Sequence, residues 1–220
     1  MLKQIFNGIF SNNGRLLTKN IVPGKRVYGE KLFSENDEEF REWIPFRSKL
    51  AAGIKNDLKE VPITKGSTVL YLGSSEGTTA SHVSDIIGKN GLLFGVDSSE
   101  RVMRKFIGLC EDRENLVPIL ADANKPKEYE EHLKGHQVDL LFQDISQKNQ
   151  AEIFNKNAAL FLSKGKPGLI AIKAKSISQG NPKQVFKKEI AELEKEFKVK
   201  QVIPLNPFEK DHVLVLCEKK

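Results

Sequence analysis

The sequence is poor in cysteine, methionine and tryptophan, and it contains no long hydrophobic segment. Its 220 residues include 2 Cys, 2 Met and 1 Trp. Cys110 and Cys217 lie far apart without ligand-like spacing, so we expect neither a disulfide nor a metal site. No apolar run approaches the ~20 residues that a membrane span needs. The segment MLKQIFNGIF carries Lys, Asn and Gly within its apolar stretch, unlike a secretory signal peptide. We therefore expect a cytoplasmic protein without membrane association.

Recognised RNA-reading modules are also missing. The sequence has no RRM signature, no KH loop and no zinc knuckle. The net charge is nevertheless +6, with a pI near 9.1. This balance favours a polyanionic partner, although it is also common in proteins that bind nothing acidic. Any nucleic acid would therefore have to be selected by something other than a sequence-reading module of this chain.

The N-terminal part differs in pattern from the rest. Residues 1–33 contain short mixed apolar and polar runs interrupted by Asn13-Gly14 and Pro23-Gly24, which are turn dipeptides. This pattern predicts a small β element of two or three antiparallel strands. We place the boundary so that residues 34–220 form the second, larger domain.

The larger domain begins with an expected helix and continues as a regular alternation. Apolar residues recur at helical spacing over 37–59, with a break at Pro45. Short continuous apolar runs, typical of strands buried in a parallel sheet, then alternate with helical stretches. The expected strands are 67–73, 91–97, 115–121, 138–144 and 168–174, and the expected helices are 79–88, 99–112, 126–134, 147–163 and 182–197.

The C-terminal part distinguishes two kinds of α/β sheet. Strand-like runs at 199–205 and 212–218 are separated only by NPFEKD, a link short enough to require an antiparallel hairpin. A dinucleotide dehydrogenase would normally continue with another parallel strand. We therefore predict an α/β protein with a Rossmann-like sheet of about seven strands, in the layout of S-adenosylmethionine (SAM) methyltransferases, plus the small N-terminal β element.

The loop after the first strand of this sheet supports the same choice. Gly73 and Gly77 give G-x-x-x-G, whereas a pyrophosphate-binding loop requires G-x-G-x-x-G. Glu76 is poorly placed for an anionic pyrophosphate. SAM has no phosphate and carries an ammonium group, so an acidic, hydroxyl-rich loop suits it better.

Acidic residues follow three further strands. Asp97, Asp122 and Asp144 each stand at or just after a strand end. Because ligands bind beyond the carboxyl ends of such strands, we expect the three carboxylates at one crevice. Asp97 would accept from ribose hydroxyls, Asp122 from the adenine amino group, and Asp144 would lie near the methionyl end. Each acid is also a common helix N-cap, and any one of them can be only that.

Several segments resemble the fibrillarin family, the RNA 2′-O-methyltransferases of box C/D ribonucleoproteins. GSSEGTTASHVSDIIG, FRSKLAAGI, LADANKPKEY, FQDISQKNQA, AIKAKSIS and PFEKDHVLVL occur in the family's order and at compatible spacing. The similarity runs from about Val27 to the C-terminus. The glycine-arginine-rich extension of eukaryotic members is absent, so the chain resembles the archaeal type. Asp97 replaces the family's usual Glu, which shortens its reach to the ribose.

The resemblance implies a cofactor site and a catalytic set. The resemblance, taken with the glycine loop, implies a set of residues that contact SAM: Gly73, Thr78, Thr79, Asp97, Ser98, Asp122, Ala123, Asp144, Ile145, Ser146 and Gln147. For catalysis it implies a Lys-Asp-Lys-His set, which falls on Lys49, Asp144, Lys173 and His212.

The residues themselves give this set a chemical logic. Lys173 and Asp144 end adjacent expected strands, which lie ~4.8 Å apart, so their side chains can meet. A ribose 2′-hydroxyl is a weak nucleophile that must be positioned and deprotonated during attack. We expect Lys173 and Asp144 to handle the proton, with Lys49 and His212 orienting the substrate. Which residue is the general base stays open, and on spacing alone Lys49 is an exposed helix charge and His212 a structural residue.

The leading hypothesis is a SAM-dependent RNA 2′-O-methyltransferase acting on rRNA, and on tRNA as a further substrate. The alternatives are a SAM methyltransferase acting on a protein side chain or small molecule, a catalytically silent ribonucleoprotein subunit, and an NAD-binding oxidoreductase. The resemblance implies three partners besides the target rRNA: a box C/D guide RNA, a Nop-domain scaffold protein and a kink-turn-binding protein.

Overall fold

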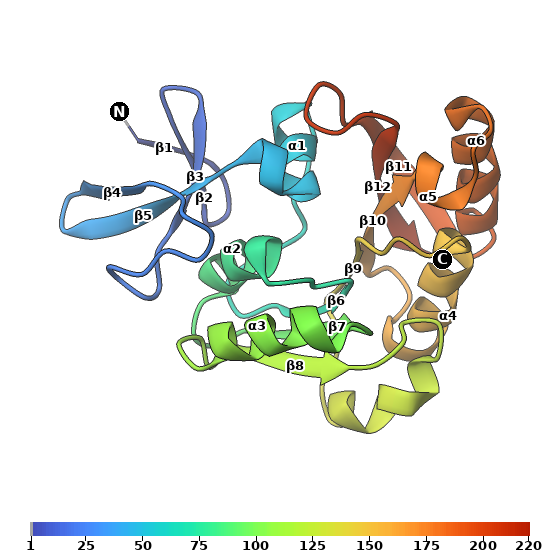
Figure 1. The fold of residues 1–220 in the computed structure, drawn as a ribbon, viewed down its shortest axis with the longest axis horizontal. Helices are drawn as coiled ribbons and strands as arrows, with labels where there is room; N and C mark the ends of the chain where they lie inside the picture. Colours follow the sequence, from blue (N-terminus) through green and yellow to red (C-terminus); the bar gives the residue numbers. More distant parts are fainter. Residues whose placement is uncertain (1) are drawn as a thin grey trace.

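The chain forms a small antiparallel sheet beside a larger mixed sheet that is covered by helices (Figure 1). The computed structural model describes residues 2–220. The small sheet has the order β1-β2-β3-β5-β4, formed by Lys3–Phe6, Ile9–Asn12, Arg15–Lys19, Leu32–Glu35 and Glu38–Trp43 (β1 to β5). The large sheet has the order β11-β12-β10-β9-β6-β7-β8.

The large sheet confirms the predicted layout. Its parallel strands are Thr68–Leu72 (β6), Leu92–Asp97 (β7), Leu116–Leu120 (β8), Leu140–Gln143 (β9) and Pro167–Lys173 (β10). Phe197–Pro204 (β11) and His212–Lys219 (β12) form the C-terminal hairpin, and β12 pairs antiparallel with both β10 and β11. The insertion of β12 between these two strands distinguishes the sheet from an all-parallel one.

Helices cover both faces of the large sheet. Lys49–Lys55 (α1), Thr78–Ile87 (α2) and Glu100–Cys110 (α3) pack on one face, and Gln150–Phe161 (α4) and Pro182–Leu193 (α6) pack on the other. Side chains alternate accordingly, so Tyr71 belongs to the first core and Leu72 to the second. The remaining elements are the 3₁₀ segments Pro45–Arg47 (η1) and Pro126–Leu133 (η2), and the short helix Ala174–Ile177 (α5).

The expected helix over 37–59 is wrong in its first part. Residues 38–43 form β5, which pairs with β3 and β4, so the small sheet runs ten residues past the expected 1–33. Phe40 and Trp43 are three residues apart, a helical spacing. In the strand they lie on opposite faces, and the buried residue that shares the face of Trp43 is the charged Arg41. Because the buried residue at position 41 is charged, the alternation of apolar and polar residues that indicates a strand is absent from the sequence.

A buried ion-pair network joins the small sheet to α2. Arg41 Nη2 lies 2.6 Å from Glu30 Oε1, and Arg41 Nη1 lies 2.8 Å from Asp85 Oδ2. Arg113 Nη1 lies 2.7 Å from Asp85 Oδ1, and the four side chains are at most 1% exposed. Asp85 therefore balances two buried guanidinium groups that come from different parts of the chain.

His82 belongs to the same buried region. Its Nδ1 lies 2.7 Å from Thr18 Oγ1 and its Nε2 lies 2.7 Å from the Tyr28 hydroxyl. Its ring stacks on Trp43, with centroids 4.9 Å apart. Burial, with smaller contributions from Arg41 and Arg113, holds the pKa of His82 well below its usual value. His82 therefore has three partners, which come from β3, β5 and the loop before β4.

Among residues 2–220, no helix is both long and apolar enough to span a bilayer.

The Asp85→Ala variant should lower the free energy of unfolding by about 3–5 kcal/mol, because it leaves Arg41 and Arg113 buried without their shared counter-charge. Urea unfolding measures this loss. The matched control is Asp112→Ala, which removes only a surface pair with Lys25 and should cost less than about 1 kcal/mol. Equal costs for the two variants would contradict the role given to Asp85.

The His82 imidazole should make stability depend on pH. Since the folded-state pKa is depressed, protons bind to the unfolded chain but not to the native His82 below about pH 6.5. The unfolding free energy should therefore fall on acidification from about pH 6.5, by at most about 1.4 kcal/mol per pH unit from this group. The slope should shrink in His82→Gln and persist in His132→Gln, a surface control.

Candidate active site

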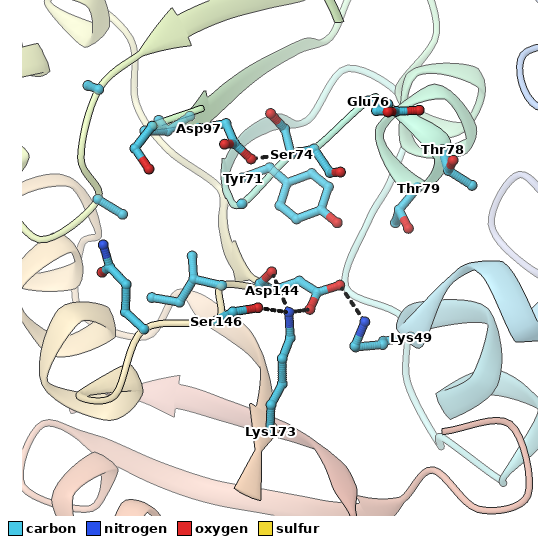
Figure 2. Close-up of a pocket in the computed structure, with 18 of the residues that line it drawn as sticks. Lys49, Tyr71, Ser74, Glu76, Thr78, Thr79, Asp97, Asp144, Ser146 and Lys173 are labelled. Carbon is cyan, nitrogen blue, oxygen red and sulfur yellow. Dashed lines mark hydrogen bonds and ion pairs between the residues drawn. The ribbon is translucent and has the colours of Figure 1, made fainter. Parts of the chain in front are cut away.

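A cavity of about 650 Å³ lies at the carboxyl ends of the parallel strands (Figure 2). Most of the predicted site residues line it: Lys49, Gly73, Thr78, Thr79, Asp97, Ser98, Ala123, Asp144, Ile145, Ser146, Gln147 and Lys173. Asp122 and His212 are outside the lining set. Residues that line it without having been predicted are Arg47, Tyr71, Ser74, Ser75, Glu76, Val96 and Ala121.

The loop between β6 and α2 forms one wall of the cavity. Gly73 has a φ of +82°, and a Cβ at this position would lie 2.6 Å from the backbone oxygen of Asp144. The backbone N–H groups of Gly73 and Ser74 donate to the Val96 carbonyl at 2.8 and 3.2 Å. The turn therefore requires glycine for two reasons, its left-handed backbone and its contact with the neighbouring strand end.

Asp97 secures both the turn before α3 and the loop after β6. Its Oδ1 accepts from the backbone N–H of Ser99, the residue before α3, at 3.0 Å. Its Oδ2 accepts from the backbone N–H of Ser75 at 3.1 Å. The N-cap of α3 is Ser99, so the capping alternative does not describe Asp97. A carboxylate has further acceptor capacity, so these two bonds leave it able to accept from a ligand.

The charge of Glu76 is balanced within the protein. Glu76 Oε1 lies 2.6 Å from Lys105 Nζ on α3, and both side chains are largely exposed. The argument from Glu76 against an anionic pyrophosphate is therefore weaker in the structure than it was in the sequence. The glycine spacing and the C-terminal hairpin are the features that still favour SAM over a dinucleotide.

Asp122 lies beside the cavity, between the lining residues Ala121 and Ala123. Its Oδ1 accepts from Gln147 Nε2 and from the backbone N–H of Asn124, each at 2.9 Å. The Gln147 hydrogen bond, followed by that from Asn124, lowers the pKa of the Asp122 carboxyl. Asp122 thus stays charged and ties the loop after β9 to the loop after β8.

Asp144 stands between two lysines (Figure 2). Lys173 Nζ lies 2.7 Å from Asp144 Oδ1 and donates to the Asp144 carbonyl at 3.0 Å and to Ser146 Oγ at 3.2 Å. Lys49 Nζ lies 3.2 Å from Asp144 Oδ2. The three side chains are only 12–16% exposed, so these charges interact with reduced screening by water. The structure thus brings together three of the four predicted catalytic residues.

The fourth residue, His212, begins β12 opposite Lys173. Its Nδ1 lies 2.6 Å from the Lys210 carbonyl, which can only accept, so the proton is on Nδ1. Glu209 in the same loop has its Oε1 3.7 Å from Lys49 Nζ. The loop between β11 and β12 therefore adds a second carboxylate to the lysine at the start of α1.

Tyr71 and Ser74 are two of the lining residues that were not among the predicted contacts: Tyr71 reads as core in the sequence, and Ser74 lies in the hydroxyl-rich loop. Tyr71 stacks on Phe142 within β6 and β9, with centroids 4.4 Å apart, and burial followed by Asp144 raises the pKa of its phenol. Ser74 Oγ is buried and has no hydrogen-bond partner among the described residues. Gln147 Oε1 is in the same condition. Such unpartnered polar atoms at a cavity are suited to bind a polar ligand.

Comparison with known proteins settles the family. The sequence model described as Fibrillarin matches residues 1–220. The chain belongs to the fibrillarin family. A relative from Thermococcus sibiricus, named fibrillarin-like rRNA/tRNA 2′-O-methyltransferase, is 48% identical over 223 residues, which cover 99% of this chain and 98% of the relative.

Solved fibrillarin structures share the whole fold. Aeropyrum pernix fibrillarin, described in complex with natively bound S-adenosyl-L-methionine, has a TM-score of 0.88 and 42% identity, with 99% of each chain covered. The fibrillarin of a fibrillarin/Nop5p complex has a TM-score of 0.90 and 36% identity, covering 99% of this chain and 100% of that one. The predicted family resemblance and fold class are therefore confirmed.

The Gly73→Ala variant tests the close contact at the loop. Placing alanine at a positive φ costs about 1–2 kcal/mol, and the clash with the Asp144 backbone should add about 1–3 kcal/mol. The matched control is Gly66→Ala, because Gly66 has a φ of +85° but nothing within 4 Å of an added Cβ. Denaturant unfolding should show a clearly larger loss for Gly73→Ala, and equal losses would remove the steric argument.

Proposed function

We propose that this chain is a SAM-dependent RNA 2′-O-methyltransferase that modifies ribose hydroxyls of rRNA and tRNA at sites chosen by a box C/D guide RNA. The carrying observation is the Asp144 carboxylate held between Lys173 and Lys49 on the wall of the cavity. The name of the Thermococcus sibiricus relative supports the reaction, and the bound ligand of the Aeropyrum pernix structure supports the cofactor.

The described residues fit SAM. Gly73 has no side chain, so a ligand can approach its backbone closely. Ser74 Oγ and Gln147 Oε1 have no hydrogen-bond partner among the described residues and can bind polar groups of the ligand. When bound, SAM supplies an electrophilic methyl group on a sulfonium sulfur. The residues that would hold it are Gly73, Thr78, Thr79, Asp97, Ser98, Asp122, Ala123, Asp144, Ile145, Ser146 and Gln147, with Tyr71 and Ser74 added from the structure.

Asp144 is the proposed acceptor of the proton from the 2′-hydroxyl. Lys173 forms an ion pair with Asp144 Oδ1 and donates to the Asp144 carbonyl and to Ser146 Oγ, so its charge and two of its N–H groups are engaged inside the protein. Lys173 thereby fixes the carboxylate rather than pointing to solvent. A positioned general base of this kind contributes about 10²–10⁴-fold to a proton-transfer step.

Lys49 and His212 are proposed to orient the RNA. Lys49 Nζ has two carboxylate neighbours, Asp144 and Glu209, at ion-pair distance, and its N–H groups can donate to a hydroxyl or phosphate oxygen of the substrate. His212 lies opposite Lys173 with Nε2 as an acceptor. Lys49 therefore stands beside the carboxylate that takes the proton, and His212 stands opposite Lys173, which holds that carboxylate.

The assembly is part of the same proposal. The fibrillarin/Nop5p complex supports a Nop-domain protein as a partner. A guide RNA and a kink-turn-binding protein would complete the particle, in a cytoplasmic location. The N-terminal domain in this proposal runs through β5 to Trp43, past the expected division at residues 33 and 34, because that division would cut β4. A methyltransferase for proteins or small molecules, or a silent subunit, would show no guide-dependent transfer to RNA.

Methyl transfer from labelled SAM to a guide-matched RNA tests the reaction. The assembled complex should label an RNA with a 2′-hydroxyl at the target nucleotide and leave the matching 2′-deoxy RNA unlabelled, because the accepting oxygen is absent. Omission of the guide RNA is the control and should abolish site-selective labelling. Equal labelling of the deoxy substrate would overturn the 2′-O assignment.

The Lys173→Ala variant tests the proton-handling pair. It removes the cation that fixes Asp144 and should lower the single-turnover rate by about 10²–10⁴-fold, with SAM affinity largely retained. The matched control is Lys175→Ala, an exposed lysine two residues along on α5, which should keep the full rate. Full turnover by Lys173→Ala would exclude the proposed pair.

A further inference from the structure

An exposed phenylalanine stands beside the cavity wall. Phe46 lies in η1 and is 62% exposed, the highest value among the exposed large hydrophobic side chains of residues 2–220. Its ring contacts Phe208 edge to face, with centroids 5.0 Å apart. Phe208 is partly buried and packs against the larger hydrophobic core. The Phe46 ring is therefore supported from behind while much of its surface is open to solvent.

The aromatic pair lies next to the proposed reaction centre. Arg47 and Lys49, which follow Phe46 in the chain, both line the cavity. On the other side, Glu209 follows Phe208 and pairs with Lys49 at 3.7 Å. The loop between β11 and β12 reaches toward α1 in Figure 1, and these contacts hold the two segments together.

The neighbouring charges favour a nucleic acid over an apolar partner. Arg47 is exposed, and its guanidinium carbon lies 6.0 Å from the centroid of the Tyr28 ring. Lys49 adds a second cation on the same wall. A flat aromatic surface bordered by cations is the usual arrangement for binding a single-stranded nucleic acid, since bases stack on the ring while cations contact phosphates.

We propose that Phe46, supported by Phe208, stacks on a base of the RNA strand that is methylated, at the target nucleotide or its immediate neighbour. This inference rests on the proposed RNA methyltransferase function and adds a positioning residue to it. Stacking would hold the target ribose against Lys49 and Asp144, and it would tolerate any base because every base offers a π-face.

Single-turnover methylation by the assembled complex, with guide-matched RNA, tests this role. The Phe46→Ala variant should lower the apparent second-order rate constant for RNA by about 5- to 150-fold, the range for loss of one stacked base, while SAM affinity stays unchanged. Phe46→Trp should restore the rate. The matched control is Ile107→Ala on α3, which removes another exposed apolar side chain and should keep the wild-type rate.

An abasic nucleotide separates stacking from other effects. The abasic nucleotide is placed in turn at the target position and at each of its two neighbours. At one of these positions only, it should lower the methylation rate of the wild type. At that same position it should cause no further loss of rate in Phe46→Ala. Any of three outcomes would overturn the proposal. Phe46→Ala could keep the wild-type rate, or its loss of rate could add to that of the abasic nucleotide at all three positions. The variant could also release the Nop-domain protein on gel filtration. Failure of the proposed function would look different, because the wild type itself would then transfer no methyl group to the 2′-hydroxyl.

Discussion

The close approach of two strand ends at Gly73 and Asp144 determines the geometry of the site. Because Gly73 has no side chain, the loop after β6 lies against the Asp144 carbonyl at a distance that a Cβ would block. That same carbonyl accepts from Lys173, whose ammonium also contacts the Asp144 carboxylate. The proposed cofactor loop and the proposed proton acceptor are thus held by one backbone contact. A shift of either strand end would move both.

The small N-terminal sheet stabilises this arrangement from a distance. Arg41 on β5 and Arg113 after α3 both pair with Asp85 on α2, and α2 begins directly after the glycine loop. With Glu30, which pairs with Arg41, the network buries four charges, and the cost of dehydrating them is offset only while all of them stay in place. The network therefore fixes the helix in one orientation relative to the small sheet, and with it Thr78 and Thr79 at the helix start.

Much of the fold could be predicted because each parallel strand is a short apolar run and each crossover has helical spacing. The strand ends in turn placed Asp97 and Asp144 at the cavity. The failures have physical reasons. The strand β5 was missed because buried Arg41 interrupts its apolar face. Tyr71 was missed because a strand residue that lines a cavity reads as core. The partners of His82 come from β3, β5 and the loop before β4, contacts that no local pattern reveals.

The position of β12 between β10 and β11 has a consequence for synthesis on the ribosome. When β10 leaves the ribosome, one of its edges stays unpaired until β12 is synthesised, some forty residues later in the sequence. The strand β11 is synthesised before β12, which is the only strand that it pairs with among the described residues. Lys49 meets Glu209 only after that same segment arrives. A nascent chain can therefore form the glycine loop and α2 early. The surroundings of Asp144, with Glu209 beside Lys49, are complete only at the last stage of folding. Such long-range pairing slows folding and leaves a sheet edge open to other chains in the meantime.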